Sequence, residues 1–332
     1  MIGPVLLAIG LATSGGAGEV SWQSGGVSRL LLVTGLAGEP QFARSFADVG
    51  GTIADAAKER WGLADSNVVY LAENPAADPK RITGRATKDA VIGALARFAS
   101  GTGNNDVVVI VLMGHGSDQT ETGRLSLPGP DLSAEDLALA LAGFKDQTVV
   151  VVNAASSSGG FIKPLSGRRR IIVTATKTSL ERNATLFGGF FAKALATDEA
   201  DGDKNGRVSV AEAYRFAKKE TVRAYESDNR LLTEHSQLDD NGDGVGSPDP
   251  TANGDGAVAQ LVAFSLTKEE TPSDPRVAAL VAERRRLETA IAGLRGRKAA
   301  MDSTAYETEL EGLLVKLAET NQAIRAAQGR PR

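Results

Sequence analysis

The chain has 332 residues, 42% hydrophobic and 23% charged, which is enough for one large globular domain or two smaller ones and excludes a disordered or fibrous protein. Lys and Arg number 37 against 41 Asp and Glu, so the formal net charge is -4 and we expect no nucleic-acid partner. The sequence has no cysteine and only two histidines, His115 and His235, which excludes disulfides, thiolate chemistry and a multi-histidine metal centre.

The first 17 residues resemble a secretory signal peptide. An apolar run over 4–12 is followed by small residues over 14–18, and Ala17 offers a cleavage position. The run is too short to span a bilayer, and no other segment approaches that length. No Lys or Arg precedes the run, so a buried N-terminal strand is the alternative. We expect export to the periplasm or the extracellular space and no stable membrane span.

From residue 28 onward, short apolar runs alternate with amphipathic stretches, a pattern that predicts strands separated by helices. The predicted strands are 30–34, 67–71, 106–113, 148–153 and 171–176, and the predicted helices are 41–61, 87–99 and 133–144. The last helix begins with a capping box at Ser133. Strands that are apolar on both faces predict a mostly parallel sheet covered by helices on both sides, an α/β three-layer sandwich.

Glycine-rich turns follow two of these strands, at the carboxyl ends where ligand chemistry gathers in such a sheet. Gly114, His115 and Gly116 follow the third predicted strand, and the sequence AASSSGGF over 154–161 follows the fourth. The order of these motifs resembles the caspase-haemoglobinase fold, and more closely the legumain-type (asparaginyl endopeptidase) peptidases, over about residues 28–265.

The resemblance implies a set of site residues. It places His115 at the catalytic histidine and Ser156 at the position of the nucleophilic cysteine. The glycines that it places at the oxyanion site and its turns are Gly114, Gly116, Gly159 and Gly160. A serine hydroxyl needs a strong, correctly oriented base, whereas a thiol is partly ionised near neutral pH. No side chain in the sequence stands out as the group that would orient the imidazole.

Three functions therefore stay open at this point. The first is a peptidase homologue with little or no activity that binds peptide segments. The second is an active peptidase that uses Ser156 and His115, and the third is a scaffold protein that presents its C-terminal helices to a partner.

An acidic segment over 201–212 matches the twelve-position EF-hand loop. Its predicted ligands are Asp201, Asp203, Asn205, the Arg207 carbonyl, Ser209 and Glu212. Predicted helices over 185–196 and 210–226 flank the loop, so the sequence predicts a calcium-binding helix-loop-helix inserted in the α/β domain.

A second acidic segment begins in the same way, with candidate ligands Asp239, Asn241, Asp243 and the Val245 carbonyl. Pro250 stands at the twelfth position and cannot bind a metal, so a looser calcium site and an Asx-rich turn are equal alternatives. His235 precedes this segment and either faces the cleft or caps a helix.

Apolar residues at heptad spacing predict a C-terminal helical hairpin over 276–297 and 304–327, with Thr304 and Glu307 as the capping box of its second helix. The polar segment 267–274 is the predicted linker, which gives an α/β domain over 28–266 and a hairpin region over 275–328. The hairpin either packs on the same domain or binds a partner as a coiled coil.

Overall fold

The computed structural model describes residues 27–104, 106–118, 123–250, 254–264, 274–296 and 301–327. The predicted signal segment and all but the last residue of the predicted linker lie outside these ranges.

A seven-stranded sheet forms the centre of the molecule, with the strand order β11-β9-β8-β4-β1-β2-β3. Its strands are β1 Val27–Thr34, β2 Val68–Ala72, β3 Gly84–Arg85, β4 Val107–Met113, β8 Thr148–Asn153, β9 Arg170–Thr174 and β11 Gln237–Asp239. All neighbouring pairs are parallel except β11 with β9. The predicted mostly parallel α/β sandwich is therefore confirmed.

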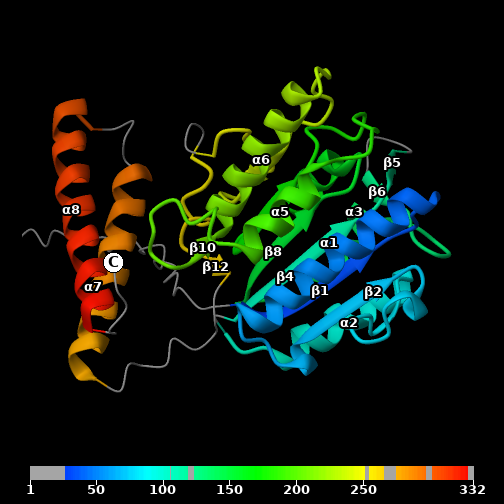
Figure 1. The fold of residues 1–332 in the computed structure, drawn as a ribbon, viewed down its shortest axis with the longest axis horizontal. Coiled ribbons are helices and arrows are strands. Elements are labelled where there is room, and N and C mark those ends of the chain that lie inside the picture. Colours follow the sequence, from blue (N-terminus) through cyan, green and yellow to red (C-terminus); the bar gives the residue numbers. More distant parts are fainter. Residues whose placement is uncertain are drawn as a thin grey trace, which may run out of the picture.

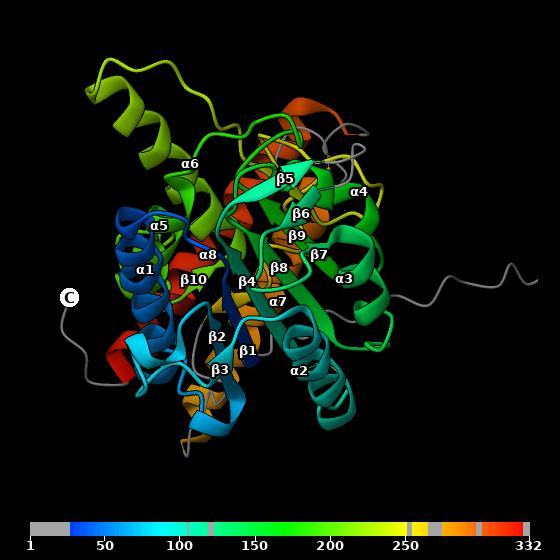
Figure 2. The same cartoon turned by 90° about the vertical axis from the view of Figure 1, so that its right-hand side faces the viewer.

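Helices cover both faces of this sheet, as Figures 1 and 2 show. Helices α1 Pro40–Glu59, α5 Phe187–Ala196 and α6 Val210–Ser227 lie on one face, and α2 Lys88–Gly101, α3 Ala134–Leu141 and α4 Ile162–Leu165 lie on the other. Short 3-10 turns occupy Asp65–Asn67, Pro75–Ala77 and Ser158–Phe161.

Two separate apolar cores result from strands that are buried on both faces. Every residue of β4 and β8 is buried, and alternate side chains point to opposite sides of the sheet. Val109 and Val111 pack under α1, α5 and α6, whereas Val108 and Ile110 pack under α2 and α3. This double burial explains why these strands read as continuous apolar runs.

The predicted capping box at the start of α3 is present. The Ser133 side chain accepts from the Asp136 N–H at 3.1 Å, and the Asp136 carboxylate accepts from the Ser133 N–H at 3.2 Å. The helix ends at Leu141, three residues before the predicted end, because the chain turns at Ala142 and Gly143 toward β8.

Two small sheets flank the main one. Strands β5 Gly116–Asp118, β6 Gly123–Leu125 and β7 Leu132–Ser133 form an antiparallel sheet directly after β4. Strand β10 Val208–Ser209 pairs with β12 Ala263–Phe264. The second pair ties the end of the predicted EF-hand loop to the segment 254–264.

The C-terminal region contains helices α7 Pro275–Gly296 and α8 Ser303–Ala327, which pack against each other at the left of Figure 1. Val277 and Val281 meet Ile324 at one end of the pair, and Leu287 and Ile291 meet Leu317 further along.

The start of α8 differs from the predicted capping box. Asp302 Oδ1 accepts from the N–H groups of Thr304 and Ala305 at 3.0 and 3.1 Å, so Asp302 takes the capping role that the sequence pattern gave to Thr304. An Asp two residues earlier satisfies the first free N–H groups equally well.

None of the helices in the described ranges is both long enough and apolar enough to cross a lipid bilayer.

Candidate functional site

Three neighbouring parallel strands bring the predicted catalytic residues together. β4 lies between β1 and β8 in the sheet, so the turns that leave the carboxyl ends of these strands meet at one edge. Ala37 follows β1, His115 follows β4 and Ser156 follows β8. The small β5-β6 sheet marks this edge at the top of Figure 2.

The imidazole of His115 is held in one orientation. Its Nε2 lies 3.1 Å from the carbonyl oxygen of Ala37. A carbonyl can only accept, so Nε2 carries the proton in this contact and Nδ1 is left as the basic nitrogen. Phe42 and Phe46 of α1 pack on the ring, with centroid distances of 4.6 and 5.5 Å. The orienting group that the sequence did not reveal is therefore a main-chain carbonyl.

Ser156 lies where the loops after β4 and β8 touch. Its side chain is buried, and its Oγ accepts a hydrogen bond from the Gly116 N–H at 3.0 Å. Among the described residues neither a hydrogen bond between Ser156 and His115 nor a partner for the Ser156 N–H is found. The Ser156 N–H is thus available as a donor for an oxyanion, whereas the Gly116 N–H is engaged by the Ser156 hydroxyl.

The serine-rich turn after β8 is fixed to the loop after β9. Ser157 has a left-handed φ of +57°, and its N–H donates to the Glu181 carbonyl at 2.8 Å. Ser158 Oγ accepts from the N–H groups of Ala175 and Thr176, both at 3.1 Å. These bonds hold the backbone around Ser156 without engaging its own N–H.

Close backbone approach explains two of the predicted glycines. A Cβ on Gly116 would lie 2.0 Å from the Ser156 carbonyl oxygen, and a Cβ on Gly159 would lie 2.3 Å from the Lys177 carbonyl carbon. The other two predicted glycines are at the same edge: Gly114 directly follows β4, and Gly160 lies against the backbone of Gly123. Glycine at these positions lets three loops pack around Ser156.

His235 faces the same region. Its Nδ1 lies 2.8 Å from Glu181 Oε1, and its main-chain N–H donates to Glu181 Oε2 at 3.1 Å. Because Glu181 also accepts the Ser157 N–H through its carbonyl, it joins the loop before β11 to the turn that carries Ser156. Nothing in the sequence marks Glu181, since its role depends on two loops that are distant along the chain.

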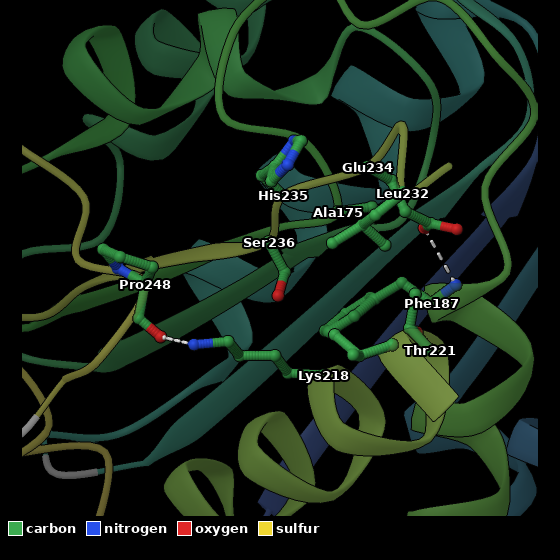
Figure 3. A pocket seen from close by; sticks show the side chains of 10 residues that line it. Ala175, Phe187, Lys218, Thr221, Leu232, Glu234, His235, Ser236 and Pro248 are labelled. Atoms are coloured by element: carbon green, nitrogen blue, oxygen red, sulfur yellow. Dashed lines mark hydrogen bonds between the residues drawn. The ribbon is translucent and has the colours of Figure 1, made fainter. Parts of the chain in front are cut away.

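A pocket of about 210 Å³ opens next to His235, between the loop before β11 and helices α5 and α6 (Figure 3). Its walls are mainly apolar, as with Ala175 and Phe187. Glu234 is buried and accepts from the Leu186 and Phe187 N–H groups at 2.7 and 3.1 Å, and burial raises the pKa of its carboxyl. Thr221 lines the pocket as well, and its buried Oγ1 has no hydrogen-bond partner in the described structure.

The first acidic loop brings three predicted metal ligands together. One carboxylate oxygen from each of Asp201, Asp203 and Glu212 lies within 4.8 Å of the others. Burial, and then repulsion by Asp203 and Glu212, raises the pKa of Asp201 to about 6. Gly206 has a φ of +82°, as the sharp turn of such a loop requires.

Of the remaining predicted ligands of this loop, Asn205 lies within the loop and Ser209 lies at its end, where α6 begins. Asn205 Oδ1 accepts from the Arg207 N–H at 2.8 Å, which closes a local turn. Ser209 caps α6 and exchanges hydrogen bonds with Glu212 in a capping box. The oxygens of Ser209 and Glu212 are thus already turned toward the start of the helix.

The second acidic loop uses its oxygens locally. Asn241 Oδ1 accepts from the Asp243 N–H at 2.8 Å, and Asp243 Oδ1 accepts from the Val245 N–H at 2.7 Å. These contacts are Asx turns, as at Asn205 in the first loop, so the looser calcium site here stays a prediction. Asp239, by contrast, is buried together with Asp255, which the EF-hand pattern does not include.

Comparison with known proteins agrees with this geometry. The fold and the strand-end site define a caspase-like α/β protein. The sequence model of the peptidase C13 family, the legumain family, matches residues 82–239, just under half of the chain. That region contains both His115 and Ser156, and the predicted resemblance to the legumain-type peptidases is confirmed over it.

No curated protein matches the chain with significance. Among solved structures, the chain is similar to protein GSU0716 from Geobacter sulfurreducens, with a TM-score of 0.43 and 14% sequence identity. The alignment covers 73% of this chain and 100% of that one.

Proposed function

We propose that the protein is an exported, peptide-binding relative of the C13 peptidases with very low turnover of its own. The observation that supports this most directly is the hydrogen bond from Gly116 N–H to Ser156 Oγ, in a site where His115 instead bonds the Ala37 carbonyl. Among the described residues, the expected general base makes no hydrogen bond to the hydroxyl that it would need to deprotonate.

Serine and cysteine differ in how much they depend on that contact. A serine hydroxyl is almost fully protonated at neutral pH and requires a base at hydrogen-bond distance, which contributes about 10²–10⁴-fold to the rate. A thiol reaches its reactive form without such a close base. A serine at this position therefore keeps the shape of the site and loses most of its nucleophilicity.

Peptide binding is supported by the surroundings of Ser156. The family acts on peptide bonds, and the pocket beside His235 offers mainly apolar walls. An extended segment that crosses the strand ends could place one side chain there while its carbonyl faces the Gly116 N–H.

We expect the wild-type chain to bind Asn- or Asp-containing peptides and to cleave them negligibly. Binding is measured by fluorescence anisotropy with labelled peptides, and cleavage by mass spectrometry after prolonged incubation. Ser156→Ala serves as the control and should leave both results unchanged. Robust cleavage that disappears in Ser156→Ala would establish the active serine peptidase instead.

We further propose that the loop 201–212 binds Ca²⁺. The support is the match to the EF-hand spacing and the cluster of Asp201, Asp203 and Glu212 within 4.8 Å. Three carboxylates at this separation repel one another, and a hard divalent cation would relieve the repulsion.

A partner-binding role of the C-terminal hairpin is a third proposal. Its seam is filled by the contacts between α7 and α8, yet Leu314 and Val315 of α8 are 41% and 51% exposed. Loss of a captured partner upon removal of residues 275–332, with the α/β domain still folded, would support this role, and unchanged capture would contradict it.

A further inference from the structure

Two buried carboxylates near the end of the sheet each have one oxygen without a partner. Asp239 is 1% exposed and Asp255 is 3% exposed, and in the described structure neither Oδ2 makes a hydrogen bond. The other oxygens are engaged: Asp239 Oδ1 accepts from Gly242 N–H at 3.1 Å, and Asp255 Oδ1 accepts from Asp240 N–H at 3.1 Å.

These carboxylates are held in place from both sides. Asp239 ends the edge strand β11, opposite Ile172 of β9. Asp255 binds the backbone after that strand, while Asp240 accepts from the N–H groups of Gly256 and Ala259 at 2.8 and 2.7 Å. This reciprocal bracing fixes the segment 254–264 against the end of β11 and keeps the two acids buried.

No described basic side chain forms an ion pair with Asp239 or Asp255. A buried carboxylate oxygen without a partner is strongly unfavourable, and two neighbouring ones are more so. A proton shared between the two carboxylates is the competing arrangement, and it predicts that this site takes up no cation.

We infer that Asp239 and Asp255 together hold a hard divalent cation, in a site separate from the loop 201–212. Two carboxylates supply the charge that balances a divalent ion, and water or main-chain oxygens would complete its shell. The arrangement differs from the EF-hand order, since Asn241 and Asp243 use their oxygens in local turns. Ca²⁺ is the expected ion because it accepts irregular oxygen shells more readily than Mg²⁺ does.

The test uses the full chain with the substitution Glu212→Gln, which weakens Ca²⁺ binding by the loop 201–212. This variant is titrated with Ca²⁺ by calorimetry. We expect one Ca²⁺ to bind. Adding Asp255→Asn or Asp239→Asn should raise its Kd about tenfold or more. Adding Asp243→Asn, a matched and exposed control, should leave the Kd unchanged. A parallel titration with Mg²⁺ should show weaker binding.

Melting curves distinguish loss of a Ca²⁺ ligand from misfolding of the variant. In chelator, Asp255→Asn should melt no lower than its parent, because the substitution removes a buried negative charge while its Oδ1 keeps the backbone bond. In Ca²⁺ the same variant should lack the rise in Tm that the parent shows. The inference is overturned if Asp255→Asn keeps the parent's Kd, if Asp243→Asn alone abolishes binding, or if the Glu212→Gln chain binds no Ca²⁺. Because Glu212 and Asp255 are tested separately, failure of one calcium site does not imply failure of the other.

Discussion

Replacing Ser156 by cysteine is expected to convert the protein into a measurable peptidase. The structure retains other parts of the site: His115 is oriented by the Ala37 carbonyl, and the Gly116 N–H reaches the side chain at the nucleophile position. The site lacks a reactive thiol and a hydrogen bond from His115 to the nucleophile, and a thiol depends less on that bond than a hydroxyl does. Since the absent base contact accounts for about 10²–10⁴-fold, we expect Ser156→Cys to cleave a peptide library at least about 100-fold faster than the wild type.

The reactivity of the new thiol provides an independent measurement. Iodoacetamide should modify Cys-substituted chains selectively, since the natural sequence contains no cysteine. Adding His115→Ala should slow this alkylation, because the imidazole then no longer favours the thiolate. A Ser156→Cys variant with ordinary thiol reactivity and no cleavage of any peptide would show that the site is not a silenced catalyst, and would leave peptide binding as the proposed function.

Removal of calcium is expected to lower the melting temperature. A cation that binds the native state with Kd stabilises it by RT ln(1 + [L]/Kd), which is about 2.7 kcal/mol when the ion is present at 100 times its Kd. The clustered carboxylates of Asp201, Asp203 and Glu212 should add to the difference, because they repel one another once the ion is removed. The measurement is a pair of melting curves in Ca²⁺ and in chelator.

Two substitutions in the same loop distinguish loss of a Ca²⁺ ligand from a general change in the loop. Glu212→Gln removes a charged ligand at the twelfth position and should weaken Ca²⁺ binding strongly, whereas Lys204→Ala changes a residue that offers no ligand atom and should not. Identical melting curves with and without chelator, together with no Ca²⁺ uptake in a titration, would rule out a calcium site at 201–212.

Most of the α/β domain could be predicted from the sequence because buried strands consist of apolar residues. Strands β4 and β8 are buried on both faces and consist of continuous apolar runs, so they could be recognised without any long-range information. The capping box at Ser133 is a local pattern, and it formed as predicted. The ends of helices were less certain, as at Leu141 and Asp302, since neighbouring residues can satisfy the same backbone groups.

Residues of the candidate site could be predicted only where their side chains, and not their main-chain atoms, take part in the site. His115 and Ser156 could be found because each follows a recognisable strand. Ala37 could not, since its contribution is a carbonyl that every residue possesses. Asp255 could not be found for a different reason: it reaches the end of β11 only through folding of the chain, where it accepts from the Asp240 N–H, and sequence spacing does not encode that contact.

The position of β1 sets a lower limit on the length of a useful fragment of this protein. The family match begins at residue 82, whereas β1, which supplies the Ala37 turn, ends at Thr34. β1 lies between β4 and β2 in the interior of the sheet, so a fragment trimmed to the matched region would expose the side of β4 to solvent and to other chains. Such a fragment would also leave the imidazole free to rotate. Expression boundaries for this protein should therefore be drawn before Val27, and a fragment cut at the family match is expected to aggregate.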